Sequence, residues 1–103
     1  GIYDLEPVRH AQFVNVDLKI AQADVPRLSP ALLPPARTIP FVSACGALES
    51  DEFQRQTGLI EQAWKPGHRS SIALPQANHL TICDAFADPG HPLCQATLAL
   101  LAR

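Results

Sequence analysis

The sequence has 103 residues, of which 47% are hydrophobic and 17% charged, and this is the composition of one small globular domain rather than of a disordered chain. The net charge of −2 and the scattered Lys and Arg argue against a nucleic-acid partner, which would need a clustered basic face. No apolar run approaches the roughly 20 residues that span a bilayer, and the N-terminus lacks the pattern of a signal peptide, so we expect a cytoplasmic protein with no membrane partner.

Residues 1–38, the lead-in, are expected to form an irregular helical segment of the kind that covers a site or crosses the edge of a sheet. Gly1 to Tyr3 look like the end of a strand. Short helical segments are predicted over residues 5–13, 16–23 and 24–28. Asp4 and Asn15 are the expected caps of the first two. Over residues 32–40, LLPPARTIP, the prolines predict an extended chain, because each proline disfavours helix at the residue before it.

Residues 39–103 are expected to alternate strands and helices. Ile39 to Cys45 is short, apolar and non-alternating, which is typical of a strand buried on both faces of a parallel sheet. Ser50 is a good N-cap, with acids in the next turn, for an amphipathic helix of about four turns. Pro66 and Gly67 should end this helix.

A second short strand is predicted over Ser71 to Pro75. A loop and helix should follow over 78–88, and then a closing helix over 91–103 with Leu93 and Leu101 on its apolar side. Strand, helix and strand of this size form a parallel crossover unit. Because two parallel strands buried on both faces need further strands beside them, the sequence predicts an incomplete α/β sheet. Its exposed edge would be open to self-association.

The crossover would bring an acid and a histidine together. Side chains that follow parallel strands meet at the edge where the strands end, so the loop with Glu49 and the loop with His79 should be neighbours. A carboxylate there can fix the tautomer of the imidazole while the other ring nitrogen acts as a base. Spacing alone equally allows a solvated loop acid and an ordinary loop histidine.

A nucleophile is missing from this pair. The pattern G-x-S-x-G does not occur, and no HGG-type stretch offers an oxyanion hole. Ser43 lies within a predicted buried strand, and Ser50 is better used as a cap. Cys45 is the only other candidate nucleophile. No helix N-terminus lies directly behind it to activate the thiol, so we interpret Cys45 as structural.

The three cysteines, Cys45, Cys83 and Cys94, show no C-x-x-C spacing, which is typical of reduced and mostly buried thiols. A zinc site or redox module built from them with His79 or His91 is an alternative that the spacing does not favour. No cofactor is expected. The absence of methionine hints that the chain begins inside a longer protein.

Short motifs spread in order along the chain resemble the C-terminal part of an α/β-hydrolase of the kynurenine formamidase (arylformamidase) and esterase group. The matching pieces are GIYDLEP at 1–7, LSP at 28–30, GALES at 46–50, EFQRQ at 52–56 and NHL at 78–80. The EF-x-RQ element after an acidic loop is the most specific of them.

The resemblance implies that residues 1–103 are one partial α/β-hydrolase domain, with Glu49 as the triad acid and His79 as the triad histidine. Two residues depart from the family pattern. The acid is commonly Asp, and the histidine is commonly followed by Phe where this chain has Leu80, which would loosen packing under the ring. The family's serine elbow and oxyanion motif would lie upstream of GIYDLEP.

We therefore expect a fragment of a serine hydrolase acting on small esters or aryl formamides, inactive by itself. The alternative is a non-catalytic remnant of a hydrolase, or an interaction module. His68, beside glycine and arginine, is expected at the surface, and Trp64 in the core.

Overall fold

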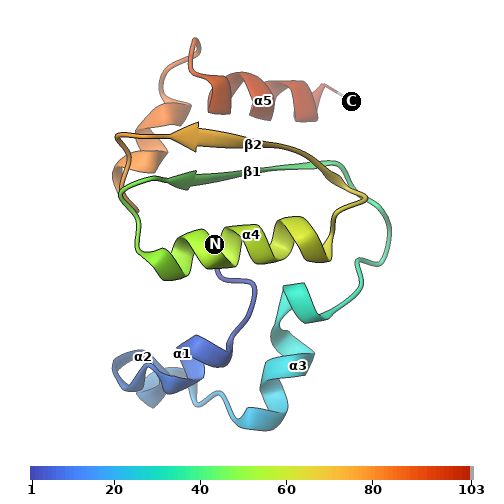
Figure 1. Cartoon of the computed structure of the whole chain (residues 1–103), viewed down its shortest axis with the longest axis vertical. Helices are drawn as coiled ribbons and strands as arrows, with labels where there is room; N and C mark the ends of the chain where they lie inside the picture. The colour runs from blue at the N-terminus through green and yellow to red at the C-terminus, as the bar shows by residue number, and fades with distance from the viewer. Residues whose placement is uncertain (103) are drawn as a thin grey trace.

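The computed structural model describes residues 1–102, in which two parallel strands lie between helices (Figure 1). The strands are β1 (Phe41–Gly46) and β2 (His68–Leu74). The α-helices are α1 (Glu6–His10), α2 (Gln12–Leu18), α3 (Val25–Leu28), α4 (Asp51–Ala63) and α5 (Pro92–Leu101). Three 3-10 helices are also present, η1 (Gln22–Asp24), η2 (Pro30–Leu32) and η3 (Thr81–Phe86). The α/β class predicted from the sequence is confirmed.

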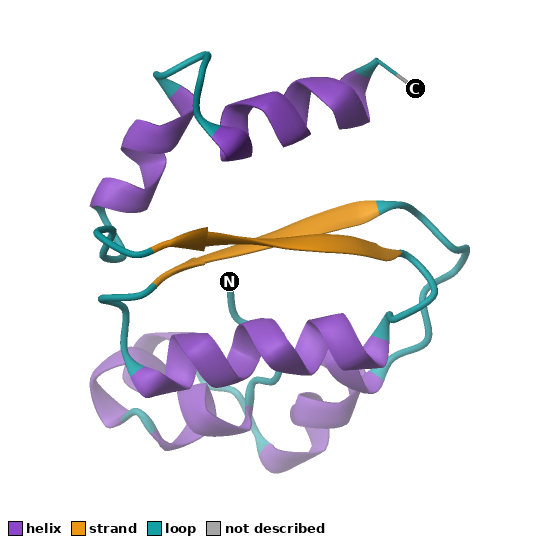
Figure 2. Ribbon diagram, turned by 45° about the horizontal axis from the view of Figure 1, so that its top comes forward, coloured by secondary structure: helices purple, strands orange, loops and turns teal. Residues whose placement is uncertain are grey.

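The two strands form a parallel pair connected through α4, as the crossover pattern predicts. Phe41 lies opposite His68 and Gly46 opposite Leu74, with an irregularity after Phe41. Helix α4 covers one face of the pair, and η3 and α5 cover the other (Figure 2). Within residues 1–102 the sheet has these two strands alone. The strand end predicted at the N-terminus is therefore wrong, and β2 begins three residues earlier than expected.

Helix α4 begins where the sequence predicts, because Ser50 acts as its N-cap. The Ser50 hydroxyl accepts a hydrogen bond from the amide of Phe53 at 3.5 Å, and two acids occupy the first turn. Ile60 is buried on the face toward the strands. Trp64 ends the helix half-buried, with its indole nitrogen donating to the carbonyl of Leu33 at 2.9 Å.

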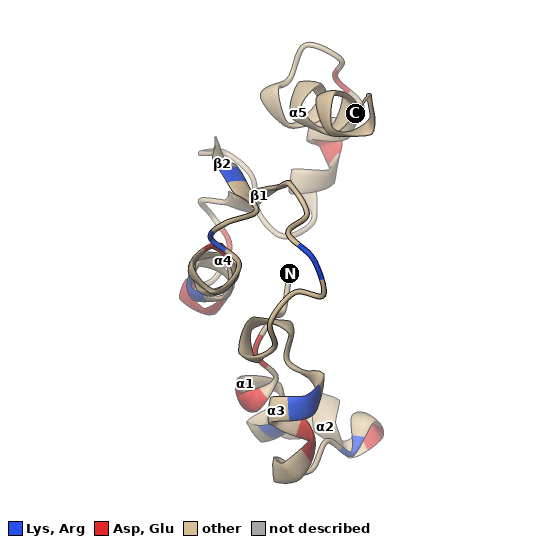
Figure 3. Cartoon of the chain, turned by 90° about the vertical axis from the view of Figure 1, so that its right-hand side faces the viewer, with Lys and Arg blue, Asp and Glu red and all other residues tan. Residues whose placement is uncertain are grey.

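The hydrophobic core lies between the strands and the C-terminal helices. Its buried members are Leu74, Ala77, Ala85 and Leu93, with Ala44, Ile72 and Ile82 packed against them. Helix α5 carries no Lys, Arg, Asp or Glu (Figure 3). Leu101 is 78% exposed rather than packed, which corrects the predicted apolar side of this helix. Arg103, in the predicted closing helix, lies outside the described residues.

The lead-in differs most from the prediction. Asn15 lies inside α2 instead of capping a later helix, and Lys19 ends α2 with a left-handed φ of 53°. The Asn15 side chain closes this turn by accepting from the amide of Ile20 at 2.7 Å and donating to the carbonyl of Arg9 at 2.9 Å. Pro30 begins the 3-10 turn η2, which overlaps the segment predicted to be extended only at Leu32.

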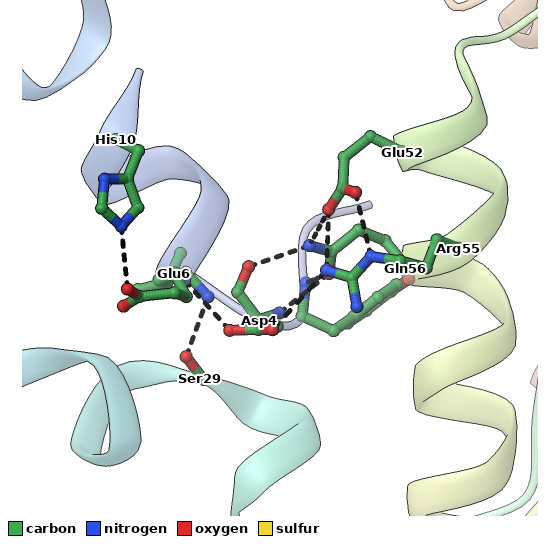
Figure 4. Close-up of polar contacts among 9 residues, drawn as sticks. Asp4, Glu6, His10, Ser29, Glu52, Arg55 and Gln56 are labelled. Carbon is green, nitrogen blue, oxygen red and sulfur yellow. Dashed lines mark hydrogen bonds and ion pairs between the residues drawn. The ribbon is translucent and has the colours of Figure 1, made fainter. Parts of the chain in front are cut away.

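A fully buried amide on α4 holds the N-terminal segment in place (Figure 4). The Gln56 side chain accepts from the amides of Tyr3 and Asp4, each at 2.8 Å. It donates to the carbonyl of Asp4 at 2.9 Å and to the carboxylate of Glu52 at 2.8 Å. The buried hydroxyl of Ser29 accepts from the amide of Leu5 at 2.9 Å. Segments about 50 residues apart are thus joined through buried, fully paired polar groups.

Candidate active site

The loops that follow β1 and β2 lie directly against one another. The amide of Ala47 donates to the carbonyl of Leu74, and the amide of Leu48 to the carbonyl of Ala77, both at 3.0 Å. A Cβ atom added at Gly46 would lie 2.2 Å from the Ala77 carbonyl oxygen. Glycine is therefore required at the end of β1 for the two loops to approach this closely.

Glu49 and His79 meet at this loop pair, as their positions in the sequence predict. Oε1 of Glu49 lies 2.6 Å from Nδ1 of His79. The other oxygen, Oε2, accepts from the amide of Gly46 at 2.9 Å and from the thiol of Cys45 at 2.7 Å. The carboxylate side chain is 5% exposed and the imidazole 60% exposed.

The surroundings keep the Glu49 carboxylate ionised. Burial raises the pKa of Glu49, but hydrogen bonds from Cys45, His79 and the amide of Gly46, together with the charge of His79, outweigh it and hold the pKa below its usual value. A carboxylate at Nδ1 fixes the tautomer in which Nε2 is the basic nitrogen. Nε2 has no hydrogen-bond partner within residues 1–102, and can act as a general base toward a group that approaches from solvent.

Phe53, in the first turn of α4, lies flat against the imidazole. The two rings are stacked, with centroids 4.3 Å apart and an interplanar angle of 23°. Leu80 is 80% exposed, so the apolar support of the His79 ring comes from α4. Asn78 shapes the loop itself, because its side-chain oxygen accepts from the amides of Leu80 and Thr81 at 2.9 and 3.0 Å.

Sequence reasoning missed the role of Phe53, because an apolar residue at helical spacing is usually assigned to the core. The signal was present in the EF-x-RQ element of residues 52–56, whose members act together. Gln56 binds the N-terminal segment, and Arg55 pairs with Glu52 at 2.8 Å and with Asp4 at 3.5 Å. This element therefore connects the lead-in to the acid and histidine through one turn of helix.

A second polar cluster lies further along α4. Glu61 accepts from the hydroxyl of Ser71 at 2.7 Å and from that of Ser43, and Nε2 of His68 lies 3.2 Å from the Ser43 hydroxyl. The imidazole is 20% exposed, which corrects the expectation that His68 is a surface group. It is half-buried because β2 begins early enough to turn it toward α4.

This cluster lacks the geometry of a nucleophilic centre. Glu61 contacts the serines directly and lies 3.8 Å from Nε2 of His68, the same nitrogen that faces Ser43. Both serine hydroxyls donate their proton to Glu61, so Nε2 of His68 is a donor toward them and cannot take the proton of Ser43. Ser43 is also buried, at 7% exposure. We assign the cluster to holding α4 against the strands.

The three cysteines are unpaired, and Cys83 is exposed rather than buried as expected. Burial raises the pKa of Cys45 and the Glu49 carboxylate raises it further, so Cys45 is not an activated nucleophile. Residues 1–102 contain no group of three or more His, Cys, Asp or Glu side chains placed to hold a metal ion. None of their helices combines the length and apolar character needed to cross a membrane.

Comparison with known proteins identifies no family for this chain. The sequence matches no protein-family model, and neither a curated protein nor a solved structure matches the chain. The Glu49–His79 pair and its surroundings are therefore the basis for a functional proposal.

Proposed function

We propose that this chain supplies the acid and the histidine of a serine hydrolase that acts on esters or aryl formamides in the cytoplasm. In this proposal the two strands belong to an α/β-hydrolase sheet. Glu49 orients His79, and His79 removes the proton from a serine that lies outside these 103 residues. The serine attacks the carbonyl carbon, and His79 then returns the proton to the leaving group.

The observation that carries the proposal is the 2.6 Å contact between Oε1 of Glu49 and Nδ1 of His79. A buried carboxylate at Nδ1 and a solvent-exposed ring are what a general base needs, because the working nitrogen must be basic and reachable. The pair also lies after parallel strands, where catalytic groups of open α/β sheets gather.

An apolar cleft of about 490 Å³, which shares Phe53 with the surroundings of this pair, supports a substrate with a hydrocarbon part. The residues that line it come mainly from the first five residues, α1, α2 and the start of α4, and they include Leu5, Val8, Phe13 and Phe53. Its volume falls in the range of small-molecule sites. Phe53 also stacks on His79, so one side chain contacts both the cleft and the imidazole.

The test is hydrolysis by the polypeptide of the whole reading frame that contains these residues. We expect phenyl acetate or N-formylkynurenine to be cleaved. His79→Ala should lower kcat by about 10³-fold or more, and Glu49→Gln should also lower it substantially. His10→Ala, which removes a surface histidine outside the pair, is the matched control. A reading frame without a serine elbow, or activity indifferent to His79→Ala, would contradict the proposal.

The isolated chain should not turn over either substrate, because no serine of residues 1–102 lies at the imidazole of His79. Turnover by the isolated chain that is lost on His79→Ala would show that the nucleophile lies within it.

A second candidate function, an interaction module, is favoured by apolar side chains left in solvent. Phe13, Leu80 and Leu101 are 84%, 80% and 78% exposed, and β1 has β2 as its one partner strand among the described residues. Self-association through the free edge of the sheet would follow from these features. Sedimentation velocity tests it: a chain that stays monomeric at high concentration would argue against this function.

A further inference from the structure

The thiol of Cys45 lies on the side of Glu49 that faces away from the imidazole. Its sulfur is 2.7 Å from Oε2, whereas His79 contacts Oε1. Cys45 belongs to β1 and is paired in register with Ala73 of β2, so the regular strand pair fixes where its side chain starts. The strand pair therefore holds the backbone of Cys45 in place, while the carboxylate that its thiol contacts lies in a loop.

Glu49 needs more than one anchor to keep its orientation. It is in a turn after β1, and its side chain has three rotatable bonds between the backbone and the carboxylate. The amide of Gly46 donates to Oε2 at 2.9 Å, but this single bond allows the carboxylate to rotate about it. A second donor on the same oxygen removes that freedom, and Oε1 then points at Nδ1.

Cys45 is in the protonation state that this role requires. Burial raises its pKa, the Glu49 carboxylate raises it further, and the neighbouring Thr57 lowers it by a smaller amount. The group thus remains a neutral thiol near pH 7, with one proton to donate. The carboxylate, being ionised, can only accept.

We propose that Cys45 is a positioning residue of the acid–histidine pair, whose thiol proton holds Oε2 of Glu49 so that Oε1 remains directed at His79. Its catalytic meaning rests on the proposed hydrolase function, whereas the hydrogen bond itself does not. The proposal extends that function to a residue that does not touch the reacting atoms. It also gives a polar role to a side chain that the sequence alone assigns to packing.

The test compares variants that differ only in the presence of a donor. Cys45→Ser keeps a hydroxyl proton at this position, and Cys45→Ala removes it at similar size. The first readout is the pH titration of the Glu49 carboxyl carbon by NMR in the 103-residue chain. The second is the proton resonance of Nδ1 of His79, which a short hydrogen bond to a carboxylate moves far downfield. Cys94→Ala is the control for loss of an unrelated thiol.

We expect Cys45→Ala to shift the Glu49 titration to higher pH and to broaden or abolish the downfield resonance. Cys45→Ser and Cys94→Ala should leave both readouts as they are in the unsubstituted chain. The proposal is overturned if Cys45→Ala behaves like the unsubstituted chain, or if Cys45→Ser shifts Glu49 as far as Cys45→Ala does. In the second case the size of the side chain, and not its proton, is what matters.

A second pair of variants keeps the test decisive if Cys45→Ala does not fold. Cys45→Thr and Cys45→Val have nearly equal volume, are both well suited to a strand and differ in the hydroxyl. Val should shift the Glu49 titration and Thr should not. Neither readout needs turnover, so they decide the role of Cys45 separately from the hydrolysis experiment, which decides the proposed function.

Discussion

The ring of Phe53 stacks on the imidazole of His79, with centroids 4.3 Å apart. We predict that Phe53→Leu destabilises the chain by about 1 kcal/mol, because an aromatic pair contributes about that much beyond its buried area. It should also weaken the downfield Nδ1 resonance of His79, since the ring is no longer held. Urea unfolding and NMR measure the two effects. Phe13→Leu, the same change at an 84% exposed position, is the control and should alter neither.

Gly46→Ala should separate the two loops of the site. The new methyl group would lie 2.2 Å from the carbonyl oxygen of Ala77, so the backbone must move, at a cost of about 1–3 kcal/mol. Gly58→Ala is the matched control, because nothing lies within 4 Å of its added carbon and alanine favours helix by up to about 1 kcal/mol. Urea unfolding should therefore give changes of opposite sign. Equal effects would show that the loop contact is not constrained.

Gln56→Glu should release the N-terminal segment from α4. The change removes the donor that binds the carbonyl of Asp4 and places a second carboxylate beside Glu52. Unsatisfied buried groups of this kind cost about 1–3 kcal/mol. Gln62→Glu, at an exposed position of the same helix, should cost less than about 0.5 kcal/mol. Hydrogen exchange of the Tyr3 and Asp4 amides measures the release, and unchanged protection would contradict the prediction.

Acid should destabilise the chain partly through Glu61. Burial raises the pKa of Glu61, but hydrogen bonds from Ser43 and Ser71 and the charge of His68 outweigh it and hold the pKa below its usual value. The folded state then binds fewer protons than the unfolded state, in which a glutamate has a pKa of about 4.3. The stabilising contribution is therefore complete above that pH and is lost as the pH falls through the folded-state value.

Urea unfolding between pH 6 and pH 3 checks this expectation. The stability of Glu61→Gln should fall less steeply over that interval than that of the unsubstituted chain, because glutamine does not titrate. Parallel curves for the two chains would show that the interactions of Glu61 do not depend on its charge.

The strand and helix order was predictable where local signals agree. A short apolar run, a serine cap followed by acids, and a proline and glycine stop were sufficient to place β1 and α4. The parallel crossover then brought Glu49 and His79 to one edge. Ser50 and Asp51 were correctly assigned to the start of the helix, which left Glu49 as the acid in contact with His79.

The lead-in could not be predicted in the same way, because its short helices depend on distant partners. Nothing near Tyr3 in the sequence reveals that its amide binds Gln56, and a glutamine on a helix ordinarily faces water. Asn15 looks like a cap but serves the turn after its own helix. Likewise, the half-buried position of His68 depends on Glu61 and the two serines, which come together only when α4 packs on the strands.

The buried amide of Gln56 has a consequence for how the chain responds to a protease. Lys19 is exposed and ends α2 in a left-handed turn, so trypsin can reach the bond that follows it. The piece released by that cut would still be bound through the backbone of Tyr3 and Asp4 to Gln56, and through Leu5 to Ser29. The two pieces should therefore migrate together under native conditions and separate only in denaturant, so that an intact native band does not prove an intact chain.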